Sequence, residues 1–282
     1  MTPVVLLVAG VSLLALSLYW MLVETEGVYL GRRVVIWLYD LYARRYDQIK
    51  SFHPDYEQWL LAEPILGILA PQQNPLVLDV ATGTGRLPLA LLDNPHFQGR
   101  VVGVDLSRAM LRQAANKLRG HERRVDLLWS SAEVLPFPDA TFDMVTCLEA
   151  LEFVPDAQIV IAEMARVLRP GGLLLITNRI NMRWMPGKTF SDEHMQDLLE
   201  RHGFEDVMPE IWQIDYHKIW ATRAGESAPV GTRPLAEFLR CPNCQQVEME
   251  AMKRAWRCNH CGAKIPVGGD GVIELQTAVP PR

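Results

Sequence analysis

Two pairs of cysteines near the C-terminus have the spacing of ligands for a single metal ion. Cys241 and Cys244 form one CxxC pair, and Cys258 and Cys261 form a second after a spacer of hairpin length. Four thiolates suit tetrahedral zinc and leave no coordination position open for water, which is the pattern of a structural site. In an oxidising compartment the same four residues would be expected to form disulfides. The compartment therefore decides between a zinc site and disulfides.

The first residues of the chain indicate the compartment. Residues 3–23 carry no charged side chain, and about 20 apolar residues are enough for a spanning helix. A cleaved signal peptide is the alternative, but no basic residue precedes the run and the run is long for a signal peptide. Five basic residues follow it, namely Arg32, Arg33, Arg44, Arg45 and Lys50. This asymmetry predicts a single-pass anchor at 1–24 with the remaining chain in the cytoplasm. Thiols stay reduced there, so the cysteines are expected to bind zinc.

A glycine-containing loop, DVATGTG at 79–85, indicates a second site. Such a loop lets the backbone approach a ligand and leaves helix N–H groups pointing at it, as dinucleotide and phosphate loops also do. Asp79 precedes the glycines, where an anion disfavours phosphate and favours an amino group. Asp105 ends the next apolar run, where an acid can accept hydrogen bonds from ribose hydroxyls. The combination predicts a ligand with a ribose and a cationic amino acid but no phosphate, which is S-adenosylmethionine (SAM).

The elements that hold this loop alternate along the chain. Apolar runs expected to be strands are separated by helical patterns and lie at 76–81, 101–106, 125–132, 142–151, 173–179, 204–214 and 216–224. The alternation predicts an α/β fold with a mostly parallel sheet covered on both faces. An amphipathic helical lead-in at 25–70, lying on the membrane or packed on the sheet domain, precedes an α/β domain at 71–224. A linker at 225–234 and the cysteine-bearing segment at 235–282 follow.

The stretch 76–223 resembles the class I SAM-dependent methyltransferases, and within them the ubiquinone/menaquinone C-methyltransferase branch. The segments LDVATGTGRL, VVGVDLSRAML, SAEVLPFPDATFDMV and EMARVLRPGGLLLIT carry the resemblance. It implies a Rossmann-like, seven-stranded, doubly wound sheet whose last hairpin includes an antiparallel strand. It also implies cofactor contacts. The methionine end would be lined by Asp79, Ala81, Gly83 and Gly85, and the ribose would be held by Asp105. The adenine would be flanked by Leu106 and Met110, with Ser131, Ala132, Glu133 and Leu148 beside it. Tyr46 would cover the cofactor.

Two positions depart from this family. Ala81 stands where relatives often have a third glycine, and Ser131 stands where an aspartate is common. A serine can still hydrogen-bond the adenine amino group, so SAM binding is expected to survive. A fold of this type that no longer binds SAM would be a non-catalytic membrane adaptor.

The methyl acceptor is only partly constrained. Methyl transfer from a sulfonium depends chiefly on holding two groups at attack distance, so this fold has no fixed catalytic residue. Glu149, Glu152 and His53 are the candidate bases or cation partners. The segment CLEALEF lacks the [ND]PP[YF] motif of enzymes that methylate glutamine or adenine nitrogens. A membrane anchor raises the effective concentration of the enzyme near lipids, which favours a small lipophilic acceptor such as a quinone precursor or a lipid.

The C-terminal segment resembles a second family. LAEFLRCPNC and WRCNHCGAKIPVGGDGVIEL are similar to zinc ribbons such as the activator subunit of tRNA, rRNA and release-factor methyltransferases, although Lys264-Ile265 departs from the pattern. The resemblance implies that the ribbon packs in cis on the methyltransferase domain. It leaves open an enzyme that methylates RNA or a translation protein. A binding module is the other alternative, with Lys253, Arg254 and Arg257 contacting phosphates and Trp256 stacking on bases. The net charge of −5 argues against a general nucleic-acid binder.

Overall fold

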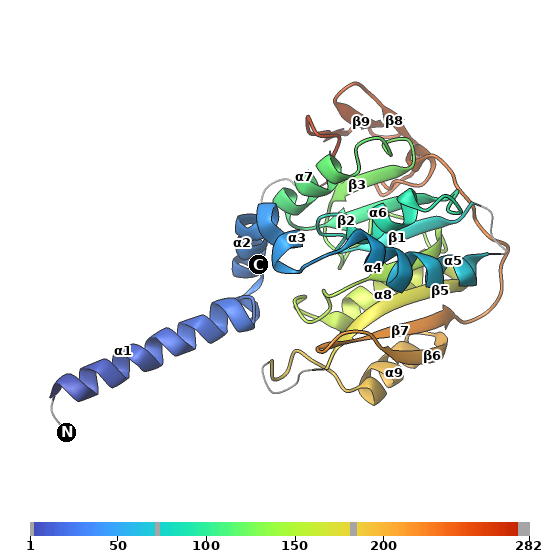
Figure 1. Ribbon diagram of the computed structural model, residues 1–282. Coiled ribbons are helices and arrows are strands. Elements are labelled where there is room, and N and C mark those ends of the chain that lie inside the picture. Colours follow the sequence, from blue (N-terminus) through green and yellow to red (C-terminus); the bar gives the residue numbers. More distant parts are fainter. Residues whose placement is uncertain (1–2, 71–73, 181–184, 276–282) are drawn as a thin grey trace.

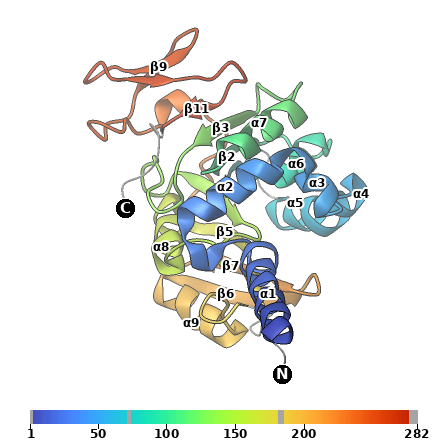
Figure 2. The ribbon, with the colours of Figure 1, turned by 90° about the vertical axis from the view of Figure 1, so that its left-hand side faces the viewer.

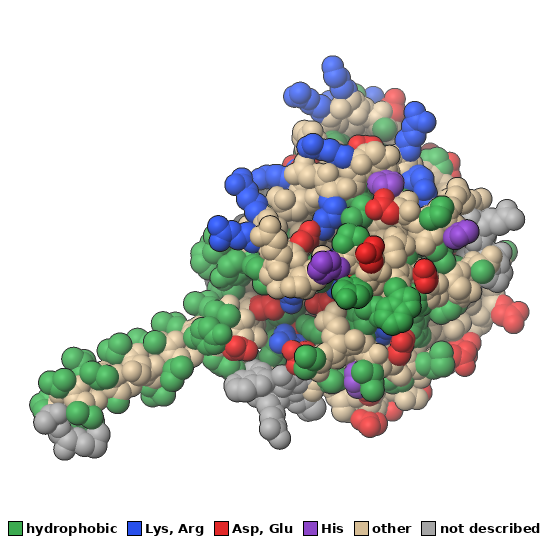
Figure 3. Space-filling view, in the orientation of Figure 1, with side chains coloured by type: hydrophobic (Ala, Val, Ile, Leu, Met, Phe, Trp, Pro, Cys, Tyr) green, Lys and Arg blue, Asp and Glu red, His purple; other side chains and the backbone are tan. Residues whose placement is uncertain are grey.

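The computed structural model describes residues 3–70, 74–180 and 185–275. A long helix, α1 (Pro3–Tyr19), continues through a π-helical turn at Trp20–Glu24 and projects from the rest of the molecule (Figure 1). An 18-residue window within this 22-residue helix, Pro3–Glu24, has a mean hydropathy of 2.3. Among the described residues, it is the one helix long and apolar enough to cross a membrane. The space-filling view shows apolar side chains along its whole length (Figure 3).

Short helices form the lead-in after α1. They are α2 (Arg32–Tyr42), α3 (Tyr46–Ile49), α4 (Pro54–Glu57) and α5 (Glu63–Leu69). Helix α2 buries Val35 and Leu38 on one side and leaves Trp37 and Leu41 more than half exposed on the other. The predicted amphipathic pattern is therefore present, and its inner face packs on the sheet domain. The predicted domain boundary at residue 71 lies outside the described residues.

The central sheet has the order β11-β3-β2-β1-β4-β5-β7-β6. Its strands are β1 (Leu76–Val80), β2 (Arg100–Asp105), β3 (Val125–Trp129), β4 (Phe142–Cys147), β5 (Leu168–Arg179), β6 (Phe204–Ile211), β7 (Tyr216–Arg223) and β11 (Ile273–Glu274). Only β7 runs antiparallel to its neighbours, as the resemblance implied. The expectation of seven strands was wrong by one, because β11 comes from the cysteine-bearing segment and pairs with β3.

Helices cover both faces of this sheet, which confirms the predicted doubly wound fold. One apolar cluster joins the sheet to α8 (Ala157–Val167) and α9 (Asp192–Arg201), and the other joins it to α5, α6 (Arg86–Asp93) and α7 (Arg108–Lys117). Strand β1 is buried at every position. Near-continuous apolar strands of this kind are what a sheet covered on both faces requires.

Several element ends differ from the prediction. Strand β3 ends at Trp129 rather than at 132, and β4 occupies the first six residues of the run 142–151 that was expected to contain it. Beyond β4 the backbone turns at Glu149, which has a left-handed φ of 51°. Strand β5 begins at Leu168 rather than at 173, so it includes the RPGG segment.

The segment predicted as a linker is fixed to the sheet by a buried carboxylate. Asp143 on β4 accepts hydrogen bonds from the backbone N–H groups of Val230 and Gly231, at 2.8 and 2.9 Å. It also accepts bonds from Leu76 N–H and from the Arg169 guanidinium. A fully buried carboxylate needs such partners to offset its desolvation. The composition predicted a linker here. These hydrogen bonds hold the backbone of that linker against β4.

The cysteine-bearing segment packs at the β3 end of the sheet, away from α1 (Figures 1 and 2). It contains a small antiparallel sheet of β8 (Met249–Ala251), β9 (Ala255–Cys258) and β10 (Lys264–Pro266). Phe238 is fully buried against Phe142, with ring centroids 5.8 Å apart. Arg108 on α7 makes two 2.8 Å hydrogen bonds to Asp270 and one of 3.0 Å to Glu274. Both ends of the segment therefore contact the α/β domain.

A chain ending at residue 267 is expected to unfold at a lower temperature than one ending at residue 275. The shorter chain loses β11, including the buried side chains of Val272 and Ile273, and leaves the edge of β3 unpaired. Burial of two such side chains contributes about 3 kcal/mol or more, which corresponds to a fall in Tm of roughly 6–12 °C. Thermal melting of both chains in detergent checks this expectation. Equal melting temperatures would mean that β11 does not stabilise the sheet.

Candidate active site

The glycine loop lies at the carboxyl end of β1, where open parallel sheets bind ligands. Ala81, Gly83 and Gly85 all have left-handed φ values, of 56°, 54° and 77°. Added side-chain atoms at Gly83 would meet nothing within 4 Å, so this residue faces open space. At Gly85 an added Cβ would lie 3.2 Å from the Ala114 side chain. Gly83 therefore leaves room for a ligand, whereas Gly85 lets the loop approach α7.

Two carboxylates stand at this edge of the sheet with different partners, and Asp79 is buried whereas Asp105 is half-buried. Asp105 accepts hydrogen bonds from the backbone N–H groups of Gly83 and Ser107, at 2.8 and 2.7 Å. Asp79 accepts bonds from the hydroxyls of Thr82 and Thr146, both at 2.6 Å. Burial raises the pKa of each carboxyl to about 6. Asp79 is buried and does not line the cavity at this edge, unlike Asp105, so it acts on a ligand as a negative charge behind the loop.

A cavity of about 140 Å³ opens at this edge, between the sheet and the lead-in helices. Eight of the predicted cofactor residues line it, namely Tyr46, Ala81, Gly83, Asp105, Leu106, Ala132, Glu133 and Leu148. Four others lie behind the wall, namely Asp79, Gly85, Met110 and Ser131. The Met110 side chain is fully buried. The hydroxyl of Ser131 accepts a 2.8 Å hydrogen bond from Arg32 and contacts the Glu133 carboxylate.

Helix α2 supplies wall residues that sequence reasoning missed, among them Arg32 and Tyr39. Arg32 donates a 2.8 Å hydrogen bond to Glu133, a residue 101 positions later. Asp40 accepts hydrogen bonds from the Ser107 hydroxyl and from Ala109 N–H at the start of α7. These contacts hold α2 across the cavity. The amphipathic pattern of α2 was the available signal, but it gave no partner for the buried face.

Tyr46 and Asp47, the first two residues of α3, have different contacts. Tyr46 lines the cavity. Asp47 accepts a 2.5 Å hydrogen bond from the Thr84 hydroxyl of the glycine loop and lies 2.5 Å from the Lys117 ammonium on α7. Asp47 thereby fixes α3 to the loop, and Tyr46 is placed over the open space beside it.

Of the three candidate bases, only Glu149 lines the cavity. Its carboxylate accepts a 2.7 Å hydrogen bond from Arg86 and lies 3.6 Å from the Lys50 ammonium. Glu152 is buried outside the cavity wall against the Tyr216 hydroxyl, and burial raises the pKa of its carboxyl to about 7. His53 is exposed at the start of α4, with its ring 5.8 Å from that of Tyr56. Neither Glu152 nor His53 is placed to touch a ligand in this cavity.

Comparison with known proteins gives the chain a family. The family described as "Methyltransferase domain" matches residues 78–176. The demethylmenaquinone methyltransferase of Bacillus licheniformis is 36% identical over 131 residues, which are 46% of this chain and 55% of that protein. A ubiquinone/menaquinone biosynthesis C-methyltransferase of Syntrophotalea carbinolica is 39% identical over 142 residues, 49% of this chain and 58% of that protein. The chain thus spans little more than half the length of these two relatives.

A third relative covers more of both chains. The demethylmenaquinone methyltransferase of Lysinibacillus sphaericus is 30% identical over 200 residues, which are 70% of this chain and 81% of that protein. The chain belongs to the SAM-dependent methyltransferase family. Two solved structures share the fold of this methyltransferase. A putative SAM-dependent methyltransferase of Methanococcus maripaludis has a TM-score of 0.54 and 18% identity, over 67% of this chain and 94% of that one. The CurJ carbon methyltransferase has a TM-score of 0.52 and 18% identity, over 60% and 54%.

The methyltransferase carries its four tail cysteines as one cluster. The Sγ atoms of Cys241, Cys244, Cys258 and Cys261 all lie within 4.8 Å of one another. Two of the separations, Cys241 to Cys261 and Cys244 to Cys258, are 3.6 Å. Zn–S bonds of about 2.3 Å in a tetrahedron place sulfur atoms roughly 3.8 Å apart. The cluster therefore has the dimensions that a four-thiolate zinc site needs.

Three further residues, His260, Trp256 and Cys147, lie outside the four-cysteine cluster. His260 points to Glu248, with 3.8 Å between Nε2 and Oε2, rather than joining the cluster. Trp256 is half-buried and packs against the core, so its ring is partly withdrawn from the surface. Cys147 is buried in β4, and burial raises the pKa of its thiol well above the ordinary value. A protonated core thiol of this kind is a packing residue.

The affinity of the methyltransferase for SAM is expected to fall between pH 7.5 and pH 5, by about tenfold for each of the two carboxyls that must be ionised. The raised pKa values mean that Asp79 and Asp105 take up protons in the ligand-free protein as pH falls through 6. A cationic ligand favours their ionised forms, so protonation weakens binding, by about 1.4 kcal/mol per pH unit for one carboxyl. The unfolded carboxyls titrate near 3.9. These two groups therefore make the ligand-free protein more stable as pH falls from 6 to 4.

Titration calorimetry with SAM at several pH values measures the affinity. Asp105→Asn should weaken binding at pH 7.5 by about tenfold or more, because a hydrogen bond to a charged group contributes about 1.5–3 kcal/mol. The same change should reduce the pH dependence to the part that Asp79 contributes, about tenfold over this range. Asp93→Asn is the matched control, because Asp93 lies at the exposed end of α6 beside His121. An affinity that does not change between pH 5 and 7.5 would contradict the assigned role of the carboxyls.

Proposed function

We propose that this protein is a membrane-anchored methyltransferase that transfers the methyl group of SAM to a small lipophilic acceptor, a quinone precursor. The observation that carries the proposal is the position of the cavity between the glycine loop and helices that continue directly from an apolar helix of 22 residues. Relatives that are named demethylmenaquinone methyltransferases support the acceptor class.

The cavity residues have distinct tasks in this proposal. SAM supplies an electrophilic methyl group on its sulfonium. Asp105 accepts hydrogen bonds from the ribose hydroxyls, and Gly83 leaves room for the backbone to approach the cofactor. Arg32 and Glu133 form the wall beside the adenine. Glu149, which faces the cavity beside Arg86 and Lys50, takes the proton that a hydroxylated acceptor loses. Tyr46 excludes water from above.

The apolar helix serves as a single-pass anchor with the catalytic domain in the cytoplasm. Basic side chains follow the helix, among them Arg32, Arg33 and Lys50, which supports this orientation. Basic side chains also lie beside the base of the helix in the space-filling view (Figure 3). Tethering the enzyme to the bilayer raises its effective concentration near a lipid-soluble acceptor.

The four cysteines hold a structural zinc ion, and the ribbon stabilises the catalytic domain in cis. The dimensions of the cluster support the zinc site. The pairing of β11 with β3 and the burial of Phe238 against the sheet support the stabilising role over recruitment of RNA. A ribbon that adds a strand to the catalytic sheet is part of the same folding unit.

Label from methyl-labelled SAM is expected to enter the quinone fraction of a lipid extract when the protein is incubated with cell membranes. Total RNA and total protein from the same reaction should stay at background. Asp105→Ala is the matched control, because loss of a ribose contact should lower the incorporation by about tenfold or more. Label found only in RNA or protein would replace this acceptor with a nucleic-acid or protein substrate. Absence of both label and SAM binding would indicate a non-catalytic adaptor.

Metal analysis of the purified protein is expected to find about one zinc ion per chain. Cys258→Ser should remove most of the zinc and lower the melting temperature, because a four-thiolate site loses a ligand. Cys147→Ala is the control, since Cys147 lies in the core strand β4 and should leave the zinc content unchanged. The SAM affinity of whatever Cys258→Ser protein folds should match that of the unaltered chain. Well-folded protein without zinc would refute the metal site.

A further inference from the structure

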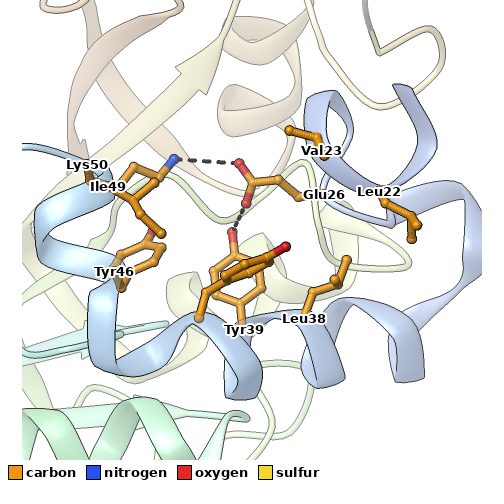
Figure 4. Close-up of a pocket in the computed structure, with 9 residues that line it drawn as sticks. Leu22, Val23, Glu26, Leu38, Tyr39, Tyr46, Ile49 and Lys50 are labelled. Carbon is orange, nitrogen blue, oxygen red and sulfur yellow. Dashed lines mark hydrogen bonds and ion pairs between the residues drawn. The ribbon is translucent and has the colours of Figure 1, made fainter. Parts of the chain in front are cut away.

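A second cavity, of about 240 Å³, lies where the apolar helix meets α2 and α3 (Figure 4). It shares two lining residues, Tyr39 and Tyr46, with the cofactor cavity. We propose that this second cavity is the acceptor site, and that it receives a hydroxylated aromatic ring carrying a prenyl tail directly from the bilayer. The proposal rests on the proposed function and adds the place, the entry route and the recognition groups.

One wall of this acceptor cavity belongs to the membrane segment itself. Leu22 and Val23 come from the last turn of the apolar helix, and Leu38 faces them from α2 (Figure 4). Val23 and Ile49 are each about half exposed, at 50% and 58%. The mouth of the cavity is therefore apolar and begins where the spanning segment ends, at the depth of the lipid headgroups. A prenyl tail in the bilayer can follow the helix into this mouth without crossing water.

The floor of the acceptor cavity is polar and connects to the cofactor cavity. The Tyr39 hydroxyl donates a 2.7 Å hydrogen bond to Glu26, and the Lys50 ammonium lies 3.6 Å from the same carboxylate (Figure 4). Lys50 is also 3.6 Å from Glu149, which lines the cofactor cavity. A ring hydroxyl placed at Lys50 would therefore lie beside the carboxylate that takes its proton. Tyr39 and Tyr46 form a partition between the two cavities, and the acceptor ring must reach past it to within attack distance of the methyl group.

The backbone is shaped to present Glu26 to this cavity. Glu26 has a left-handed φ of 48°, a conformation that costs a non-glycine residue roughly 1–2 kcal/mol. Gly27 follows with a φ of 76°, and an added Cβ there would lie 2.8 Å from Leu38. The strained turn brings Glu26 inward and lets α2 pack against the end of the apolar helix. Strain of this kind is typical of functional sites.

The charges select a quinol ring over a phospholipid headgroup. Lys50 is flanked by two carboxylates, Glu26 and Glu149, so the floor carries no free positive charge for a phosphate. The aromatic side chains of Tyr39, Tyr42 and Tyr46 line the cavity, and such rings favour stacked or edge contacts with another ring. Burial raises the pKa of the Tyr39 hydroxyl, with Glu26 adding to the effect. Tyr39 thus stays protonated as a donor.

Kinetics of the full-length protein in phospholipid nanodiscs test the site with reduced demethylmenaquinone carrying a two-prenyl tail. Val23→Trp, which fills the mouth, should raise the KM for this quinol about tenfold or more and leave the affinity for SAM within twofold. Val11→Trp is the matched control, because Val11 is 60% exposed on the same helix and outside the cavity. Glu26→Gln, which keeps the size of the side chain, should raise the same KM by about tenfold. Equal KM values for Val23→Trp, Glu26→Gln and Val11→Trp would overturn the proposal.

Photolabelling separates this proposal from the proposed function. A photoreactive analogue of the prenylated quinone should label Leu22, Val23 or Tyr42 in the unaltered chain, and Val23→Trp should abolish the label. Labelling without methyl transfer to any quinol would leave the site in place and refute the proposed reaction. Methyl transfer without labelling at these residues would refute the site and leave the reaction. Loss of the label in excess phosphatidylethanolamine but not in excess quinone would show that the cavity binds a phospholipid and would overturn the quinol assignment.

Discussion

The carboxylate of Asp105 is the junction on which the site depends. One oxygen accepts a hydrogen bond from Gly83 N–H in the glycine loop, and the other accepts one from Ser107 N–H at the start of α7. The Ser107 hydroxyl in turn donates to Asp40 on α2. One half-buried carboxylate therefore fixes two loops of the sheet and, through Ser107, the helix that covers them. These hydrogen bonds offset the cost of partly burying the charge. The Asp105 side chain is therefore held in place even though the pKa of its carboxyl is raised to about 6.

The covering helices link the sheet to the apolar helix. Tyr39 and Tyr46 line both cavities, so any movement of α2 or α3 changes the two together. The charges along this partition alternate, from Glu26 to Lys50, Glu149, Arg86 and Glu57. In such a series each carboxylate has a cation beside it, which limits the cost of placing several charges in a part-buried site. In the proposed acceptor site, a ring that enters from the lipid would therefore meet charged groups that already have partners.

The two edges of the sheet are protected differently. Strand β3 is covered by β11 and by the Arg108 contacts with Asp270 and Glu274. Strand β6 is largely exposed along its length and contains Pro209 and Glu210, and proline and charged side chains are common means of blunting an edge strand. The cysteine-bearing segment thus covers the edge of β3, whereas the proline and charged residues of β6 protect its own edge.

The sequence by itself determined the features that depend on spacing over short distances. The CxxC pairs, the glycine loop, the alternation of strands and helices and the length of the apolar helix are all local patterns, and the structure contains each of them. Eight of twelve predicted cofactor residues line the cavity for the same reason, since strand ends in a parallel sheet share one edge.

Only the tertiary structure decided which members of a motif face the ligand and which face the core. Gly83 and Gly85 are equivalent in the motif, but α7 packs against one and leaves the other open. The Arg32 contact with Glu133 spans 101 residues, and the Arg108 contact with Asp270 spans 162. Neither contact can be predicted from a periodic pattern in the sequence. The eighth strand and the second cavity arise from such pairings, because their energies depend on surfaces that meet only after the chain has folded.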